Sequence, residues 1–252
     1  MDTTQPTSRL TVNRVAHMRL QSIDVLRGIA ILGVVVFHFV WDLDYAGIYV
    51  GLAGHPAWLL FGRTLAGTFM FLVGISLVLA HTQHMRWRSF VRRLSVIVVS
   101  AALISALTYA FFPGNFVYFG ILHAIAAATL IGVLFLRSHP IIPTAVGLVV
   151  ILLPWLVNAA AFDTRWLAWI GFAATPPPSN DYVPIFPWVG LTIVAIGATK
   201  AALSSGLYGR IIQLETHENR RFLPFVWMGR HSLVIYLVHQ PVLLAIILPF
   251  AR

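Results

Sequence analysis

The chain contains no cysteine and few charged residues. Of its 252 residues, 10% are charged and 59% are hydrophobic, whereas soluble domains carry roughly 25% charged and about 45 to 50% apolar residues. The lack of cysteine excludes disulfides, thiol nucleophiles and cysteine-ligated metal. The lack of charge excludes a water-soluble globular domain, because so apolar a chain cannot cover its surface with polar side chains. The composition therefore predicts a membrane protein.

Long apolar runs recur along the chain, and most are close to the roughly 20 residues that a transmembrane helix needs. They fall at 24–41, 57–80, 94–112, 116–136, 141–161, 183–203 and 232–250. These runs predict an all-α polytopic bundle of about seven spans. The segment 166–174 is apolar but too short to cross, so we expect it to lie in the interface or to re-enter. The predicted organisation is a cytoplasmic tail over 1–21 and one transmembrane domain over 22–252.

The basic residues are placed as in a membrane protein and not as in a nucleic-acid-binding protein. The formal charge is +9, Lys200 is the only lysine, and most arginines lie beside the apolar runs. With the N-terminus in the cytoplasm, the outer side carries only Arg165 and Arg252. Such an excess of positive charge on the inner side is typical of membrane proteins. It predicts that the N-terminus lies inside and the C-terminus outside, with membrane lipid and not nucleic acid as the partner.

Three ionisable residues line one stripe of the first apolar run. Asp24 and Arg27 are three residues apart, and His38 follows eleven residues later, which returns to within about 20° on a helix. Arg27 lies towards the cytoplasm, and His38 lies about 16 Å further along the axis. An ionisable group in a span costs roughly 2.5 to 3.5 kcal/mol and usually has a function. The alternative is that Asp24 neutralises an anchoring Arg27 while His38 is a hydrogen-bonded structural histidine.

Further polar residues lie near the predicted outer side. Arg63 is about six residues into the second run, where the sequence favours an anion partner inside the bundle over an outward-pointing side chain. His123 is similarly deep in the fourth run, and alone it is expected to be a packing histidine. His55 lies in the first outer loop just before Trp58, where a histidine is usually simply exposed. Asp42 is also expected in this loop.

The last apolar run begins with Gly229-Arg230-His231-Ser232 and contains His239-Gln240-Pro241. Pro241 is expected to interrupt and kink this helix, with His239 or Gln240 satisfying the freed backbone groups. The chain has no GxSxG, P-loop or HExxH motif, so the sequence does not support hydrolysis by serine, nucleotide or zinc chemistry.

The run Ser22–Ala30 followed by His38 resembles the opening helix of the transmembrane acyltransferases. In the acyltransferase-3 branch a basic residue, ten residues and a histidine form the signature, and Arg27 to His38 has that spacing. Later segments more closely resemble bacterial relatives of heparan-α-glucosaminide N-acetyltransferase, and together the blocks span about 19 to 245. They are Phe71–Ser76, Tyr182–Trp188, Gly229–Leu233 and Tyr236–His239.

This resemblance implies transfer of an acetyl group from cytosolic acetyl-CoA to an amine or hydroxyl of an outer-side sugar or envelope glycan. It also implies an integral protein of the bacterial inner membrane. His55 with Trp58 resembles the catalytic site of the heparan enzyme, in its first luminal loop, whereas His38 corresponds to the key histidine of the acyltransferase-3 branch. Both histidines therefore stand as catalytic candidates.

The residue chemistry is compatible with acyl transfer. A histidine can take the acceptor proton near neutral pH, or carry the acetyl group as an acyl-imidazole. Arg27 and Arg230 are expected to hold the CoA phosphates, with Asp24 orienting Arg27. Arg63 or His123 is expected to contact the acceptor or to stabilise the thioester oxyanion, because of the depth of these residues in the predicted spans. No metal is expected.

Two other classes of function remain open from the sequence. His38, His123 and His239, on three helices, are candidate haem ligands in an electron-transfer or binding protein. Asp24, Arg27 and His38 could instead form a proton or anion path in a transporter, although the sequence has no internal repeat of the kind common in carriers. The sequence also leaves open whether the chain forms a homo-oligomer.

Overall fold

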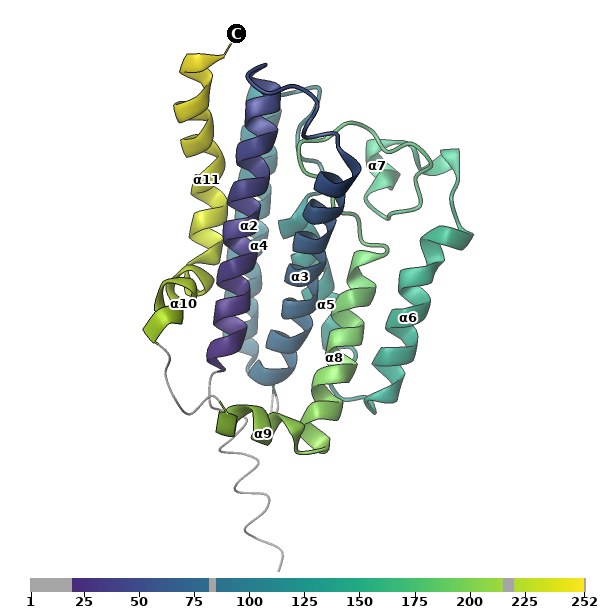
Figure 1. Cartoon of the computed structure of the whole chain (residues 1–252). Helices are drawn as coiled ribbons and strands as arrows, with labels where there is room; N and C mark the ends of the chain where they lie inside the picture. Colours follow the sequence, from purple (N-terminus) through teal and green to yellow (C-terminus); the bar gives the residue numbers. More distant parts are fainter. Residues whose placement is uncertain (1–19, 82–84, 215–219, 252) are drawn as a thin grey trace, which may run out of the picture. The chain divides into compact units, whose positions relative to one another are not determined.

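A computed structural model describes residues 20–81, 85–214 and 220–251, and these ranges contain helices but no strand. The predicted tail up to residue 19 and Arg252 lie outside them. The all-α prediction is confirmed (Figure 1). The α-helices are α2 (Gln21–Tyr45), α3 (Pro56–Ala80), α4 (Trp87–Phe111), α5 (Ile121–Val133), α6 (Ile141–Leu156), α7 (Arg165–Ala168), α8 (Trp188–Ser204), α9 (Leu207–Leu214), α10 (Leu223–Arg230) and α11 (Ser232–Ile247).

Each of the seven apolar runs contains a helix, but the helices differ in length. Within the described ranges, four helices are long and apolar enough to cross a membrane. A fifth candidate is α8 combined with Leu207–Gln213, a pair bent by 79°. The helices α5 and α6 are apolar but shorter. The chain is therefore an integral membrane protein with four candidate spans, while about seven spans and the side of each terminus stay predictions.

The chain divides into two compact units, each described here by itself. Of the described residues, the first unit comprises 70–81 and 85–214, and the second comprises 20–69 and 220–251. In the first unit, α6 packs on α8 where two glycines meet. A Cβ atom on Gly147 or on Gly190 would come within 2.7 Å of the carbonyl oxygen of the other. Because a side chain there would meet backbone, glycine allows this close approach.

The first unit also holds α5 by both of its ends. The backbone N–H of Ile121 donates to the Oδ2 atom of Asp181 at 2.8 Å. The Lys200 ammonium donates to the carbonyl oxygens of Phe135, at 3.1 Å, and Ser138. A carboxylate at the N-terminal end and an ammonium beyond the C-terminal end both complement the helix dipole. Lys200 itself belongs to the otherwise apolar helix α8, and these carbonyl oxygens give its charged group hydrogen-bond partners.

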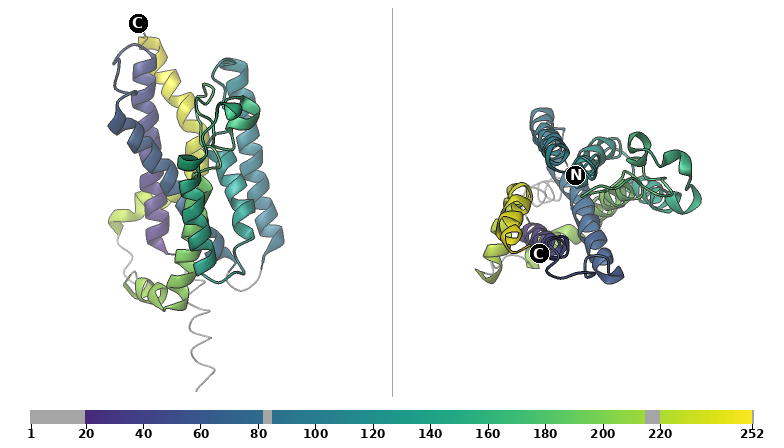
Figure 2. Two further views of the ribbon diagram at one scale, coloured as in Figure 1. Left: turned by 90° about the vertical axis from the view of Figure 1, so that its right-hand side faces the viewer. Right: turned by 90° about the horizontal axis from the view of Figure 1, so that it is seen from above.

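In the second unit, α11 runs beside α2, as both views of Figure 2 show. The helix α11 continues through Pro241, so the predicted interruption there is wrong. Two residues before Pro241, the Nδ1 atom of His239 lies 2.6 Å from the carbonyl oxygen of Tyr236. A proline removes one backbone donor, but packing against a second helix can hold the chain helical around it. The break in the helix comes earlier, at His231 between α10 and α11.

Candidate functional site

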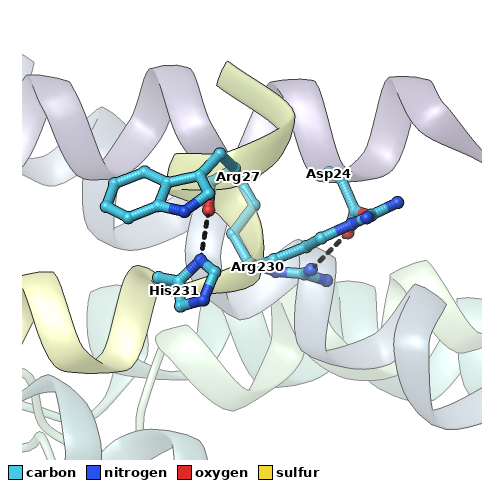
Figure 3. Close-up of polar contacts among 5 residues, drawn as sticks. Asp24, Arg27, Arg230 and His231 are labelled. Carbon is cyan, nitrogen blue, oxygen red and sulfur yellow. Dashed lines mark hydrogen bonds and ion pairs between the residues drawn. The ribbon is translucent and has the colours of Figure 1, made fainter. Parts of the chain in front are cut away.

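Asp24 joins two arginines from distant parts of the chain (Figure 3). Its Oδ1 atom accepts from the Nη1 atom of Arg27 at 3.0 Å, and its Oδ2 atom from the Nε atom of Arg230 at 3.3 Å. Asp24 is 1% exposed. Among the described residues, one carboxylate thus faces two guanidinium groups. The structure brings together three residues that were predicted to act together.

Close packing of α10 on α2 places Arg230 next to Asp24. A Cβ atom on Gly229 would overlap the backbone oxygen of Asp24, and one on Gly28 would overlap that of Phe225. Two glycines, one from each helix, therefore allow the backbones to touch. Small residues are favoured at such contacts between apolar helices because they let the backbones approach.

Asp24→Asn is expected to lower the free energy of unfolding by about 3 kcal/mol, because it removes the charge of the buried carboxylate that Arg27 and Arg230 both contact. Asp44→Asn is the matched control. Asp44 is partly exposed and accepts from the backbone N–H groups of Gly51 and Ala53, so an amide oxygen can take over part of its role. Thermal unfolding in detergent measures both variants. Equal losses of stability would show that the ion pairs contribute little.

His38 and His239 lie in direct ring contact further along α2. Their ring centroids are 4.9 Å apart, and the rings are inclined by 60°. His239 is buried, and the 2.6 Å contact of its Nδ1 atom with the carbonyl oxygen of Tyr236 requires Nδ1 to carry the proton. In the neutral ring, Nε2 is then an acceptor. That Nε2 atom is buried and has no partner in the described part of the chain.

Asp42 lies one turn beyond His38 on α2, and it faces the same helix α11. Its Oδ1 atom accepts from the Nε2 atom of Gln240 at 2.7 Å. The prediction that Asp42 belongs to the outer loop is wrong, because α2 extends to Tyr45 and Asp42 is 2% exposed. The apolar run ends before Asp42, but helical hydrogen bonding continues, as the bond from Ala46 N–H to the carbonyl oxygen of Asp42 shows.

His55 and Arg63 are both exposed on the second unit. His55 immediately precedes α3, and its Nδ1 atom accepts weakly from the backbone N–H of Ala57 at 3.3 Å. Close by in sequence, Trp58 stacks on Phe37 with ring centroids 5.8 Å apart. Among the described residues Arg63 forms no ion pair, so the anion partner expected for Arg63 stays a prediction.

His123 belongs to the first unit and works as a local cap. Its Nδ1 atom accepts from the backbone N–H of Gly120 at 3.2 Å, and its Nε2 atom lies 3.3 Å from the hydroxyl of Ser105. That hydroxyl donates to the carbonyl oxygen of Val117. Since both ring nitrogens have partners, the structure favours the packing role for His123 over contact with a substrate.

The contact between His38 and His239 also bears on haem. Two axial histidines lie on opposite faces of the porphyrin, which separates their rings. Rings in direct contact leave no room for a porphyrin between them, and His123 has both nitrogens engaged. The geometry therefore does not favour the haem hypothesis.

Asp42 and Gln240 were not among the predicted catalytic or binding residues, and His239 was predicted only as a candidate haem ligand. A signal for them existed in the sequence. Asp42 follows His38 by four residues, which places both on one helix face, and His239-Gln240 is a polar pair within the last apolar run. Both features mark polar groups in lipid, where a partner is required.

In a comparison with known protein families, residues 19–241 match the family described as heparan-alpha-glucosaminide N-acetyltransferase, catalytic. No curated protein and no solved structure matches the chain. The matched range contains Asp24, the histidines of α2 and α11, and the arginine of α10. Since the match covers most of the chain, the protein belongs to the heparan-alpha-glucosaminide N-acetyltransferase catalytic family of membrane acetyltransferases.

Proposed function

We propose that this protein transfers an acetyl group from cytosolic acetyl-CoA to an amine or hydroxyl of an outer-side sugar or envelope glycan. Acetyl-CoA is the donor used in this family in general. The observation that carries the proposal is the arrangement of polar groups along α2. A positive cluster around Asp24 lies near its start, and the His38–His239 pair lies in its second half. One helix thus joins a charged end suited to a nucleotide with a histidine end suited to acyl transfer.

The charged end supports donor binding. Arg230 uses its Nε atom for Asp24, while its side chain is 53% exposed and its two terminal nitrogens have no partner among the described residues. These terminal nitrogens can hold a phosphate oxygen by charge-assisted bonds. In this proposal Arg230 contacts a CoA phosphate, Asp24 orients both arginines, and Arg27 adds to the positive field.

The histidine end supports the transfer step. A histidine takes the proton of the acceptor while its nitrogen or oxygen bonds to the acetyl carbon. The carbon–sulfur bond then breaks, and the CoA thiolate recovers a proton. His38 and His55 are the proposed bases, and an acyl-imidazole on either is the two-step alternative. Arg63, exposed on the same unit, is proposed to contact the acceptor or the developing oxyanion.

The test is acetyl transfer by the purified protein in lipid nanodiscs. Acetyl-CoA labelled in the acetyl group is incubated with a panel of amino sugars and envelope glycans, and labelled product is separated and counted. We expect acetyl-CoA to bind and at least one acceptor to be acetylated. A protein that neither binds nor consumes acetyl-CoA contradicts the proposal. A Soret band would instead support haem, and uptake into proteoliposomes without acetylation would support transport.

A further inference from the structure

The pairing of α2 with α11 buries a group of hydrogen-bond acceptors near the histidine pair. Asp42 is 2% exposed and His239 is 8% exposed. Gln240 lies beside His239 on α11. Three buried acceptor atoms of these residues have no hydrogen-bond donor among the described residues: Oδ2 of Asp42, Nε2 of His239 and Oε1 of Gln240. An unpaired buried polar atom destabilises a protein, because it has lost its water without gaining a partner. Three such acceptors on two paired helices therefore need a reason.

The known hydrogen bonds fix which atoms are free to accept. Gln240 points its amide NH₂ to Oδ1 of Asp42 at 2.7 Å, which leaves the amide oxygen unpartnered. His239 uses its Nδ1 proton for the carbonyl oxygen of Tyr236, which leaves the Nε2 lone pair free. Asp42 has one oxygen paired and one open. Each side chain is thus anchored by one polar atom and presents one acceptor.

The two helices bring these acceptors to the histidine pair. Asp42 and His38 stand one turn apart on α2, while Gln240 and His239 are consecutive on α11. Gln240 contacts Asp42, and His239 contacts His38. The free acceptors therefore belong to residues of the two helix segments that meet at the contact between His38 and His239.

We propose that Asp42, His239 and Gln240 bind the hydrogen-bond-donating group of the acetyl acceptor, its neutral amine or its hydroxyl, beside His38. This inference rests on the proposed acetyl transfer. A neutral amine has two donor hydrogens and a hydroxyl has one, so groups of this class complement acceptors that the protein leaves unpaired. The three residues are binding and positioning residues, and the reacting proton goes to the base already proposed.

Two conservative substitutions test the site. Asp42→Asn keeps an oxygen for Gln240 and replaces the open oxygen with an NH₂ donor. His239→Asn keeps a donor for the carbonyl oxygen of Tyr236 and removes the Nε2 acceptor. The matched control is His81→Asn, since the Nδ1 atom of His81 lies 2.9 Å from the carbonyl oxygen of Leu77 and His81 belongs to the other unit.

The readout is glucosamine binding to the protein in nanodiscs, followed by tryptophan fluorescence, together with acetyl-transfer kinetics. We expect Asp42→Asn and His239→Asn to weaken glucosamine binding and to raise the acceptor KM at least 10-fold. The Kd for acetyl-CoA and the unfolding temperature are expected to stay near wild type, and His81→Asn is expected to bind normally. A structural role would instead lower the unfolding temperature.

The outcomes separate this site from the proposed function. If glucosamine does not bind wild type, or binds all variants equally, the site is overturned even where acetyl transfer is observed. If glucosamine binds as expected but acetyl-CoA is neither bound nor consumed, the site stands as a binding site and the transferase proposal fails.

Discussion

Gly229→Ala is expected to lower the free energy of unfolding by more than about 3 kcal/mol and to abolish acetyl transfer. A methyl group at this position overlaps the backbone oxygen of Asp24 and would come within 3.1 Å of the backbone nitrogen of Gly28. Backbone in the middle of a helix cannot turn aside as a flexible side chain can. The helix α10 must therefore move away from α2, which carries Arg230 away from Asp24.

Gly28→Ala tests the same contact from the other helix, because its methyl group would overlap the backbone oxygen of Phe225. Gly54→Ala is the control, since a Cβ atom there has no neighbour within 4 Å and the backbone is not in the left-handed region. It is expected to change stability by no more than about 0.5 kcal/mol. Thermal unfolding in detergent gives the comparison. If Gly229→Ala and Gly54→Ala unfold alike, the described packing of α10 on α2 is incorrect.

Replacing the catalytic histidine with alanine is expected to lower acetyl transfer by roughly 10² to 10⁴-fold, the usual contribution of a general base. His38→Ala and His55→Ala are compared on the same acceptor. His38 is packed against a second ring between two helices, whereas His55 is exposed at the start of α3. The variant with the larger loss of kcat identifies the base, and labelled acetyl bound to the protein would identify an acyl-imidazole.

His139→Ala is a close control for the His55 variant. His139 is also exposed, precedes a proline, and its Nδ1 atom accepts from the backbone N–H two residues later, in Ile141. It lies in the first unit and has no proposed role, so transfer is expected to continue at the wild-type rate. Full activity in both His38→Ala and His55→Ala would refute the proposed chemistry.

Local features were predicted well from the sequence. Asp24 and Arg27 pair as their three-residue spacing indicated, because helix geometry alone makes such residues neighbours. The end of α2 was predicted less well. Hydropathy marks where a segment stops being apolar, and a helix can continue past that point.

In the candidate site, too, some residues were predicted well from the sequence and others were not. His38 was found because a titratable group in an apolar helix is costly and therefore conspicuous. Asp42 was assigned to a loop because it adjoins the end of the run. His239 and Gln240 were read as groups that repair the helix around Pro241, whereas their side chains meet α2. His123 has a local role at the start of α5, which depth in the membrane could not reveal.

The sequence by itself determined that this is a helical membrane protein of an acetyltransferase type with a polar stripe on its first helix. These features depend on composition, on the 3.6-residue period and on motifs that are continuous in the chain. Only the tertiary structure decided the partners of that stripe, Arg230 for Asp24 and His239 for His38, and the burial of Asp42 against Gln240. These partners come from the opposite end of the chain, and their contacts exist because two glycines bring α10 onto α2 and α11 then follows along it.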